Sequence, residues 1–214
     1  MIVVILGPPG SGKGTQAQRL AEKLNLVHIS AGDILRKAIA DRTDLGKKVK
    51  DIVESGRLVP DELVTEVIID RLECDDLRDD LILDGYPRTL GQARALDSYL
   101  EKKGKRVNAA INLDTSYEEV KRRIRSRIIC SRCGENQSVR EANQKRTDKC
   151  TKCGAPLLQR EDDHEEVIRE RLKNYHNHTK TLLDYYKEEG VLKEVNGEGD
   201  IAEVFSRLIR AVQK

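Results

Sequence analysis

Aromatic residues, net charge and long apolar runs are all scarce in this sequence of 214 residues. It has no tryptophan, one phenylalanine and six tyrosines, and its net charge of +2 gives no strong overall field. The apolar run at residues 2–6 is too short for the hydrophobic segment of a signal peptide, and no basic segment precedes it. We therefore expect a cytoplasmic protein without a membrane partner, whose five cysteines are reduced or bound to metal.

Positive charge is concentrated in one segment. Residues 120–160 contain 12 lysines and arginines against three acidic residues, but no aromatic residue. Such a basic segment is compatible with nucleic-acid binding, whereas proteins that hold single strands usually stack the bases on aromatic rings. We therefore expect no nucleic-acid partner. The less favoured alternative is a protein whose basic segment binds nucleic acid under the control of nucleotide hydrolysis.

The pattern Gly-Pro-Pro-Gly-Ser-Gly-Lys-Gly-Thr at residues 7–15 lies between an apolar stretch and a helix-compatible one. Its glycines allow backbone N–H groups to face inward, and the following helix adds the positive end of its dipole. Lys13 supplies a cation for the outer phosphates, and Thr15 a hydroxyl for Mg²⁺. A glycine-rich turn without a ligand needs one glycine rather than four, so the pattern predicts a phosphate-binding loop. Unlike most such loops, this one has Gly14 between the lysine and the threonine.

A second informative stretch is Leu-Ile-Leu-Asp-Gly-Tyr-Pro-Arg at residues 81–88. An apolar strand ends here in a carboxylate, as the Mg²⁺-organising strand of phosphate-loop proteins does. Because ligands bind at the carboxyl ends of parallel strands, we expect Asp84 and Arg88 to face the phosphate-binding loop.

The spacing of four cysteines predicts a metal site. Cys130 and Cys133 form one Cys-x-x-Cys pair, Cys150 and Cys153 form another, and 16 residues separate the two pairs. This spacing is typical of a zinc ribbon with four thiolate ligands, and two disulfides are the alternative. Cys74 lies outside the pattern.

Alternating apolar strands and amphipathic helices predict the fold. Strands are expected at residues 2–6, 27–30, 81–84, 107–113 and 191–195, and no strand interrupts the helical periods between residues 30 and 59. The fold class is therefore α/β, a three-layer phosphate-loop fold with a parallel sheet of about five strands, a helical insertion and a zinc ribbon.

Three motifs together resemble the adenylate kinase family: the glycine-rich loop, Ser-x-Gly-Asp-x-Leu-Arg at residues 30–36, and Asp-Gly-Tyr-Pro-Arg at residues 84–88. The resemblance runs through essentially the whole chain and includes the position of the cysteine pairs in the long-form lid. It implies phosphoryl transfer from MgATP to AMP, with ATP, AMP and ADP as small-molecule partners, a structural Zn²⁺ and a monomer. The chain departs from many relatives at Ala31, where they carry threonine. Its lid loop also lacks their aromatic and histidine residues.

The resemblance also implies a division of the chain and a set of site residues. The core comprises residues 1–29, 60–126 and 161–214, the insertion that binds the monophosphate 30–59, and the lid 127–160. The expected catalytic residues are Lys13, Asp84, Arg88, Arg127, Arg160 and Arg171. The expected ATP-binding residues are Gly10, Ser11, Gly12, Lys13, Gly14, Thr15, Arg123 and Arg127. The expected AMP-binding residues are Ser30, Ala31, Arg36, Arg57, Leu58, Val59, Gly85, Tyr86, Pro87, Arg88, Gln92, Arg160 and Arg171. A pyrimidine or guanine monophosphate kinase remains the alternative within the same enzyme class.

Overall fold

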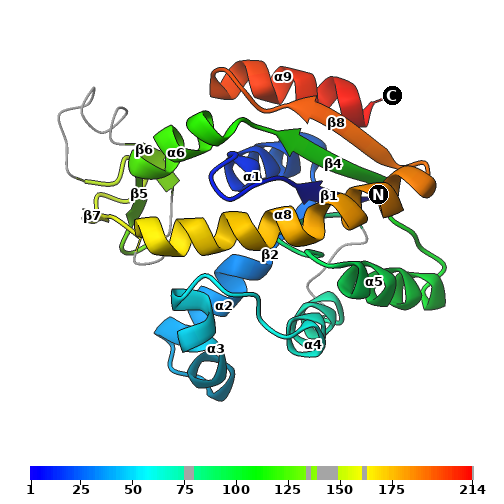
Figure 1. The fold of residues 1–214 in the computed structure, drawn as a ribbon, viewed down its shortest axis with the longest axis horizontal. Helices are drawn as coiled ribbons and strands as arrows, with labels where there is room; N and C mark the ends of the chain where they lie inside the picture. Colours follow the sequence, from blue (N-terminus) through cyan, green and yellow to red (C-terminus); the bar gives the residue numbers. More distant parts are fainter. Residues whose placement is uncertain (75–79, 134–135, 139–148, 161–162, 214) are drawn as a thin grey trace.

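A computed structural model describes residues 1–74, 80–133, 136–138, 149–160 and 163–213. Its centre is a parallel sheet of five strands in the order β2-β3-β1-β4-β8 (Figure 1). The strands are β1 (Ile2–Leu6), β2 (Val27–Ser30), β3 (Leu81–Asp84), β4 (Ala109–Asp114) and β8 (Leu192–Asn196). The expected parallel sheet is confirmed, and its last two strands begin and end one or two residues later than predicted.

Helices cover both faces of the sheet, which explains why the side chains of β1 are all buried. On one face Val3 and Ile5 pack in a core with α1 (Lys13–Leu24) and α9 (Ile201–Val212). On the other face Ile2 and Val4 pack in a larger core with α5 (Leu90–Lys102) and α8 (Glu165–Glu188). In Figure 1, α8 crosses in front of the strands, with α9 above it and α5 below it. A strand buried on both faces is continuously apolar, as the sequence of β1 is.

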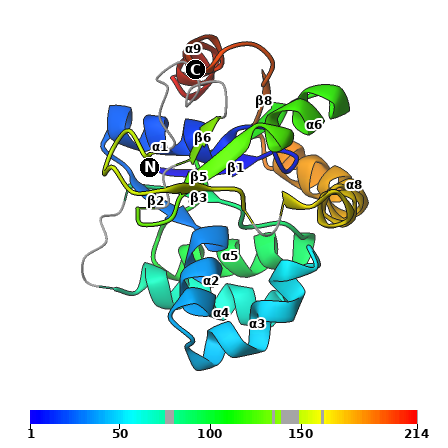
Figure 2. The ribbon, with the colours of Figure 1, turned by 90° about the vertical axis from the view of Figure 1, so that its left-hand side faces the viewer.

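Three helices lie below the sheet on the side of β2 (Figure 2). They are α2 (Ala31–Ala40), α3 (Asp44–Glu54) and α4 (Asp61–Leu72). The Ser30 side chain accepts a hydrogen bond from Asp33 N and Thr43 accepts one from Gly46 N, so each side chain caps the helix that follows it. The helical reading of this segment is confirmed.

A small antiparallel sheet, in the order β6-β5-β7, follows α6 (Tyr117–Arg125). Its strands are β5 (Arg127–Cys130), β6 (Asn136–Ser138) and β7 (Leu157–Leu158). Figure 2 shows β5 and β6 in front of the end of the main sheet. No helix among the described residues is long and apolar enough to cross a membrane.

Candidate functional site

A cavity of about 940 Å³ lies at the carboxyl ends of β1, β2 and β3, where Leu6, Ser30 and Asp84 end their strands. Such ends converge because the strands are parallel and the chain leaves the sheet there. Arg127 of β5 also lines it, together with Cys133 and Lys152 from the turns next to the small sheet, so this part of the chain closes one side. The predicted site residues that line this cavity are Gly10, Ser11, Gly12, Lys13, Gly14, Thr15, Ser30, Arg36, Leu58, Asp84, Gly85, Pro87, Arg88, Arg123, Arg127, Arg160 and Arg171.

The loop between β1 and α1 is shaped by two of its glycines. Gly10 has φ +85°, and a Cβ at this position would lie 2.5 Å from Cγ1 of Ile124 on α6. A Cβ on Gly14 would lie 3.2 Å from Oδ2 of Asp84, so the start of α1 packs closely against the end of β3. The absence of a side chain at Gly14, between Lys13 and Thr15, thus allows the start of α1 to lie against the Asp84 carboxylate.

Lys13 occupies the middle of the loop, where its Nζ donates a 3.2 Å hydrogen bond to the carbonyl oxygen of Pro8. The pKa of Lys13 is lowered to about 8, chiefly because the residue is buried; Asp84 opposes this shift, and the nearby cations Arg88, Arg127 and Arg171 add to it. An anion bound here would compensate both the burial and the repulsion among the cations. The site is therefore suited to a phosphate group.

Asp84 faces the loop and is nearly buried, with 8% of the residue exposed. Its Oδ2 lies 3.8 Å from Nε2 of His28, and its Oδ1 is buried without a hydrogen-bond partner among the described residues. A hard cation coordinated by one carboxylate and by substrate phosphates would satisfy such an oxygen. The residues present therefore fit Mg²⁺ brought in with a nucleotide.

Two of the arginines are organised by one acid. Arg127 donates from Nε and Nη2 to the two oxygens of Asp163, and Nη1 of Arg171 lies 3.9 Å from Oδ1 of the same carboxylate. The Asp163 side chain is fully buried, whereas about a fifth of each arginine is exposed. A forked pair of this kind fixes the plane of a guanidinium. Arg127 and Arg171 are thus held at the cavity wall by Asp163, which is not among the site residues predicted from the sequence.

Two further arginines are oriented by their own segments. Nη2 of Arg36 donates to Oδ1 of Asp33 one turn earlier on α2, and Nε of Arg88 donates to the carbonyl oxygen of Gly85 at 2.9 Å. The Asp33–Arg36 pair keeps the pKa of Asp33 low despite the burial of that carboxyl, which raises it. The cavity therefore gathers cations from α2, the turn after β3, the small sheet and α8.

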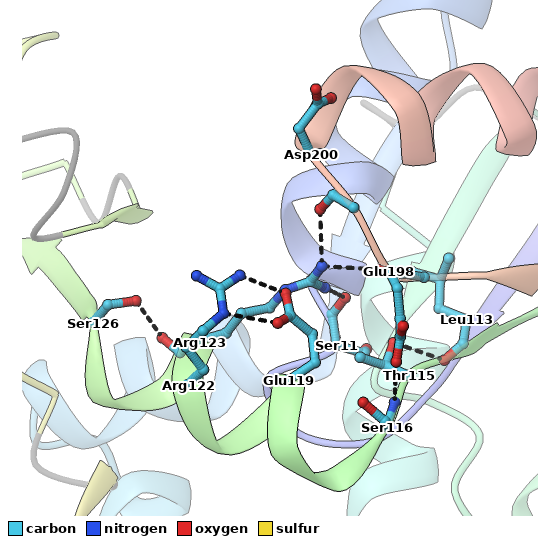
Figure 3. Close-up of polar contacts among 12 residues, drawn as sticks. Ser11, Leu113, Thr115, Ser116, Glu119, Arg122, Arg123, Ser126, Glu198 and Asp200 are labelled. Atoms are coloured by element: carbon cyan, nitrogen blue, oxygen red, sulfur yellow. Dashed lines mark hydrogen bonds and ion pairs between the residues drawn. The ribbon is translucent and has the colours of Figure 1, made fainter.

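Arg123 lines the cavity, but most of its N–H groups donate hydrogen bonds to other residues of the protein (Figure 3). Its Nη1 donates to Ser11 O at 2.7 Å, its Nη2 to Gly197 O and Gly199 O at 2.9 and 3.2 Å, and its Nε to Glu119 at 2.6 Å. Arg123 therefore joins the phosphate-binding loop to the segment before α9. One N–H of Nη1 and the planar face of the guanidinium remain for a ligand.

A smaller cavity of about 50 Å³ opens beside the first and shares Gly32, Arg36 and Arg88 with it. Its other walls are mostly apolar. The predicted residues found only here are Ala31, Arg57, Val59 and Gln92.

Tyr86 lines neither cavity, although it stands in the motif at residues 84–88. Its side chain is 1% exposed and packs in the larger core, where its hydroxyl lies 3.1 Å from Oγ1 of Thr65 and donates to Gln92 O. The residues on either side of it, Gly85 and Pro87, do reach the larger cavity.

Several residues around the cavities were not singled out from the sequence. Asp61 accepts hydrogen bonds from Thr89 and Gln92, and Asn174 on α8 donates to Gly56 O at 3.3 Å. The only sequence signal for Asp61 was its place at a helix start, where an acid is expected to favour the dipole. The partners of such residues are distant in sequence and follow from packing.

The four paired cysteines form one cluster, as their spacing predicts. Their Sγ atoms lie within 4.8 Å of one another, and the separation is 3.4 Å for Cys130 and Cys153 and 3.6 Å for Cys133 and Cys150. Four thiolates 2.3 Å from a tetrahedral zinc would be about 3.8 Å apart. Backbone N–H groups of Cys133 and Arg132 point at Sγ of Cys130 and lower its pKa to about 6, which favours the thiolate. The donor set therefore fits a soft, tetrahedral metal and leaves no open coordination position.

Comparisons of this chain with a family model and with individual proteins point to the same family. A model of the family described as "Adenylate kinase" matches residues 5–191. The chain is 45% identical over 214 residues to the adenylate kinase of Archaeoglobus fulgidus, and the alignment covers 100% of this chain and 99% of that relative. It is 44% identical over 214 residues to the adenylate kinase of Thermodesulfovibrio yellowstonii, with 100% of both chains covered, and 46% identical over 208 residues to that of Fervidobacterium nodosum, with 97% and 95% covered.

Proposed function

Because the chain belongs to the adenylate kinase family, we propose that its reaction is the reversible transfer of a phosphoryl group from MgATP to AMP, which gives two ADP. The chain is a nucleoside monophosphate phosphotransferase, and in this role it would balance the adenine nucleotides of the cell. The observation that carries the proposal is the convergence of Lys13, Asp84 and the arginines on one cavity that has a second, apolar cavity beside it.

The two cavities suggest where each nucleotide binds. The loop at residues 7–15 and Arg123 would hold the phosphates of ATP and one side of its base. The smaller cavity, with Val59 and Gln92, would receive the base of AMP, and Arg36 and Arg88 would hold its phosphate. The reacting phosphates then meet in the larger cavity between Lys13 and the arginines.

The chemistry requires positioning and charge neutralisation more than covalent catalysis. Each nucleotide brings several negative charges, which Lys13, Arg88, Arg127, Arg160 and Arg171 neutralise. The transferred group spreads charge over its oxygens, and donors fixed in advance stabilise that charge better than mobile water does. Because the second pKa of a phosphate monoester is about 6, the acceptor is an anion at neutral pH and needs no general base.

Two metals accompany this assignment. Asp84 and Thr15 would hold the Mg²⁺ that arrives with ATP, and this ion would supply positive charge to the phosphates. The cluster of Cys130, Cys133, Cys150 and Cys153 would hold a structural Zn²⁺ that stabilises the small sheet without taking part in the reaction.

The division of the chain belongs to the proposal as well. We assign residues 30–59 to the part that binds the monophosphate, 127–160 to the lid, and the rest to the core. The lid carries Arg127 and Arg160, both of which line the larger cavity, so movement of this segment relative to the core would bring these two arginines to the phosphates or withdraw them. The adenylate kinase lid is itself a standard example of such closure. We further propose a cytoplasmic monomer that binds neither membranes nor nucleic acid.

Steady-state assays with MgATP and each of AMP, GMP, CMP and UMP test the assignment. We expect kcat/KM to be highest for AMP by at least about tenfold, since the acceptor cavity must distinguish the bases by hydrogen bonds. Turnover of CMP or UMP that equals or exceeds that of AMP would overturn the adenine assignment and favour a pyrimidine monophosphate kinase.

A further inference from the structure

The side-chain amide of Gln92 is held at both ends by the protein. Its Oε1 accepts a 2.7 Å hydrogen bond from the backbone N–H of Arg88, and its Nε2 donates a 2.7 Å hydrogen bond to Oδ1 of Asp61. Gln92 is 2% exposed and lines the smaller cavity. A residue assigned to read a base therefore has its own orientation set by two neighbours.

Asp61 is itself fixed by a second donor. Oγ1 of Thr89 donates to Oδ2 of Asp61 at 2.6 Å, while the same Oγ1 accepts from Gln92 N at 3.2 Å and caps α5. Asp61 is the first residue of α4, so one carboxylate joins the starts of two helices. Both of its oxygens are engaged, which leaves it little freedom to turn.

These partners accept only one orientation of the amide. An ionised carboxylate can only accept hydrogen bonds, and a backbone N–H can only donate. If the Gln92 amide were flipped, its oxygen would face the Asp61 carboxylate and its NH₂ group would face the N–H of Arg88. Both contacts would then be mismatched in a buried place, where unsatisfied polar groups are costly.

The amide retains hydrogen-bonding capacity in this orientation. An amide NH₂ carries two hydrogens and its oxygen two lone pairs, and Asp61 and Arg88 use one of each. One N–H and one lone pair remain. Adenine offers the complementary groups on one edge, N1 as an acceptor and the 6-amino group as a donor. A 6-oxopurine offers the reverse, a donor at N1–H and an acceptor at O6.

We propose that Asp61 is a specificity-determining positioning residue: it holds the Gln92 amide in the orientation that accepts a 6-aminopurine and rejects a 6-oxopurine. This inference rests on the proposed function, since it concerns the acceptor nucleotide of that reaction. Asp61 acts through Gln92 and does not itself touch the base.

The test compares AMP with IMP, which differ only at positions 1 and 6 of the purine, in the wild type and in Asp61→Asn. Asparagine has the same size and can present either an oxygen or an NH₂ group to Gln92, so it no longer rejects the flipped amide, and only the backbone N–H of Arg88 still favours the original orientation. We expect the ratio of kcat/KM for AMP to that for IMP to fall by about tenfold or more, with KM for ATP unchanged. Asp61→Glu, which keeps an acceptor-only group, should retain more of the ratio than Asp61→Asn does.

Glu62→Gln is the matched control, because it removes the same charge from the next, exposed position of α4. It should leave the AMP to IMP ratio unchanged. If Asp61→Asn melts below the assay temperature, Asp61→Ser measured below its own melting temperature replaces it, since a serine hydroxyl is too short to hold the amide.

The outcomes separate this inference from the proposed function. A wild type that uses IMP as well as AMP would overturn the adenine assignment. A wild type selective for AMP, together with an Asp61→Asn variant in which kcat/KM falls equally for AMP and IMP, would overturn only the role of Asp61 and leave it a structural residue.

Discussion

Arg127 and Asp163 form a two-point ion pair in which Nε and Nη2 of the arginine donate to the two oxygens of a fully buried carboxylate. Arg171 approaches the same carboxylate at 3.9 Å. One acid thus connects the first residue of β5 with the long helix α8. This pair holds the small sheet to the core beside the phosphate-binding loop.

Asp163→Asn should therefore destabilise the protein. The substitution removes the counter-charge of two arginines, and breaking a buried pair costs about 3–5 kcal/mol, which partial exposure of the arginines reduces to about 1–3 kcal/mol. Chemical denaturation measures this change in the free energy of unfolding. The control is Asp41→Asn, which breaks an exposed pair with Lys37 and should change the free energy by less than about 0.5 kcal/mol. Equal effects of the two substitutions would contradict the proposed importance of Asp163.

Lys13→Met should lower kcat by roughly 10²–10⁴-fold, because it removes a charge that acts on the phosphoryl group as it transfers. The melting temperature should stay the same or rise, since burial of the charged lysine is unfavourable, as its lowered pKa shows. Arg88→Ala should behave similarly in kcat. Lys47→Met, at an exposed position of α3, is the control that should leave kcat unchanged. A normal kcat with only KM raised would limit Lys13 to ground-state binding.

The pH dependence of nucleotide binding should report the pKa of Lys13, which is about 8 in the free protein. Above this pH the free lysine is neutral, so binding of an anionic phosphate must take up a proton, and affinity should fall by up to about tenfold for each further pH unit. Calorimetric titration with magnesium-free ATP between pH 7.5 and 9.5 measures this fall. Lys13→Arg, which stays charged throughout, should show a flatter profile. Identical profiles for both proteins would contradict the assignment.

The same pKa has an effect of the opposite sign on the stability of the free protein. The folded value of about 8 lies below the ordinary value of 10.5, so the unfolded chain binds more protons between these two values. The contribution of Lys13 to stability therefore improves as pH rises from about 8 to 10.5, while nucleotide affinity declines.

Replacement of Cys130 and Cys133 by serine should abolish metal binding and lower the melting temperature, because structural zinc contributes its binding free energy to folding. Elemental analysis under reducing conditions should find about one zinc per chain in the wild type. Cys74→Ser, which changes an exposed cysteine outside the cluster, should keep both the metal and the melting temperature. A metal-free wild type of equal stability would exclude the zinc ribbon, and stability lost to reductant rather than to chelator would favour two disulfides.

Local sequence was sufficient to predict the phosphate-binding loop, the strand that ends at Asp84 and the cysteine cluster. In each case a few neighbouring residues carry the signal, because glycines, apolar runs and Cys-x-x-Cys pairs determine local backbone and donor geometry directly. The parallel sheet followed from the alternation of strands and helices. The division into core, insertion and lid remains a prediction, as do the roles of the individual site residues.

The tertiary structure alone decided which groups meet. An aspartate at a helix start has the same local sequence whether it favours the dipole or holds a distant amide, and only packing of α4 against α5 joins Asp61 to Gln92, 31 residues away. Packing likewise buries Tyr86 in the core. It also brings the guanidinium of Arg123 within hydrogen-bond distance of backbone carbonyls up to 112 residues away. Such partners depend on long-range geometry that no short pattern encodes, so the sequence determined the chemistry available to the site and the fold determined its arrangement.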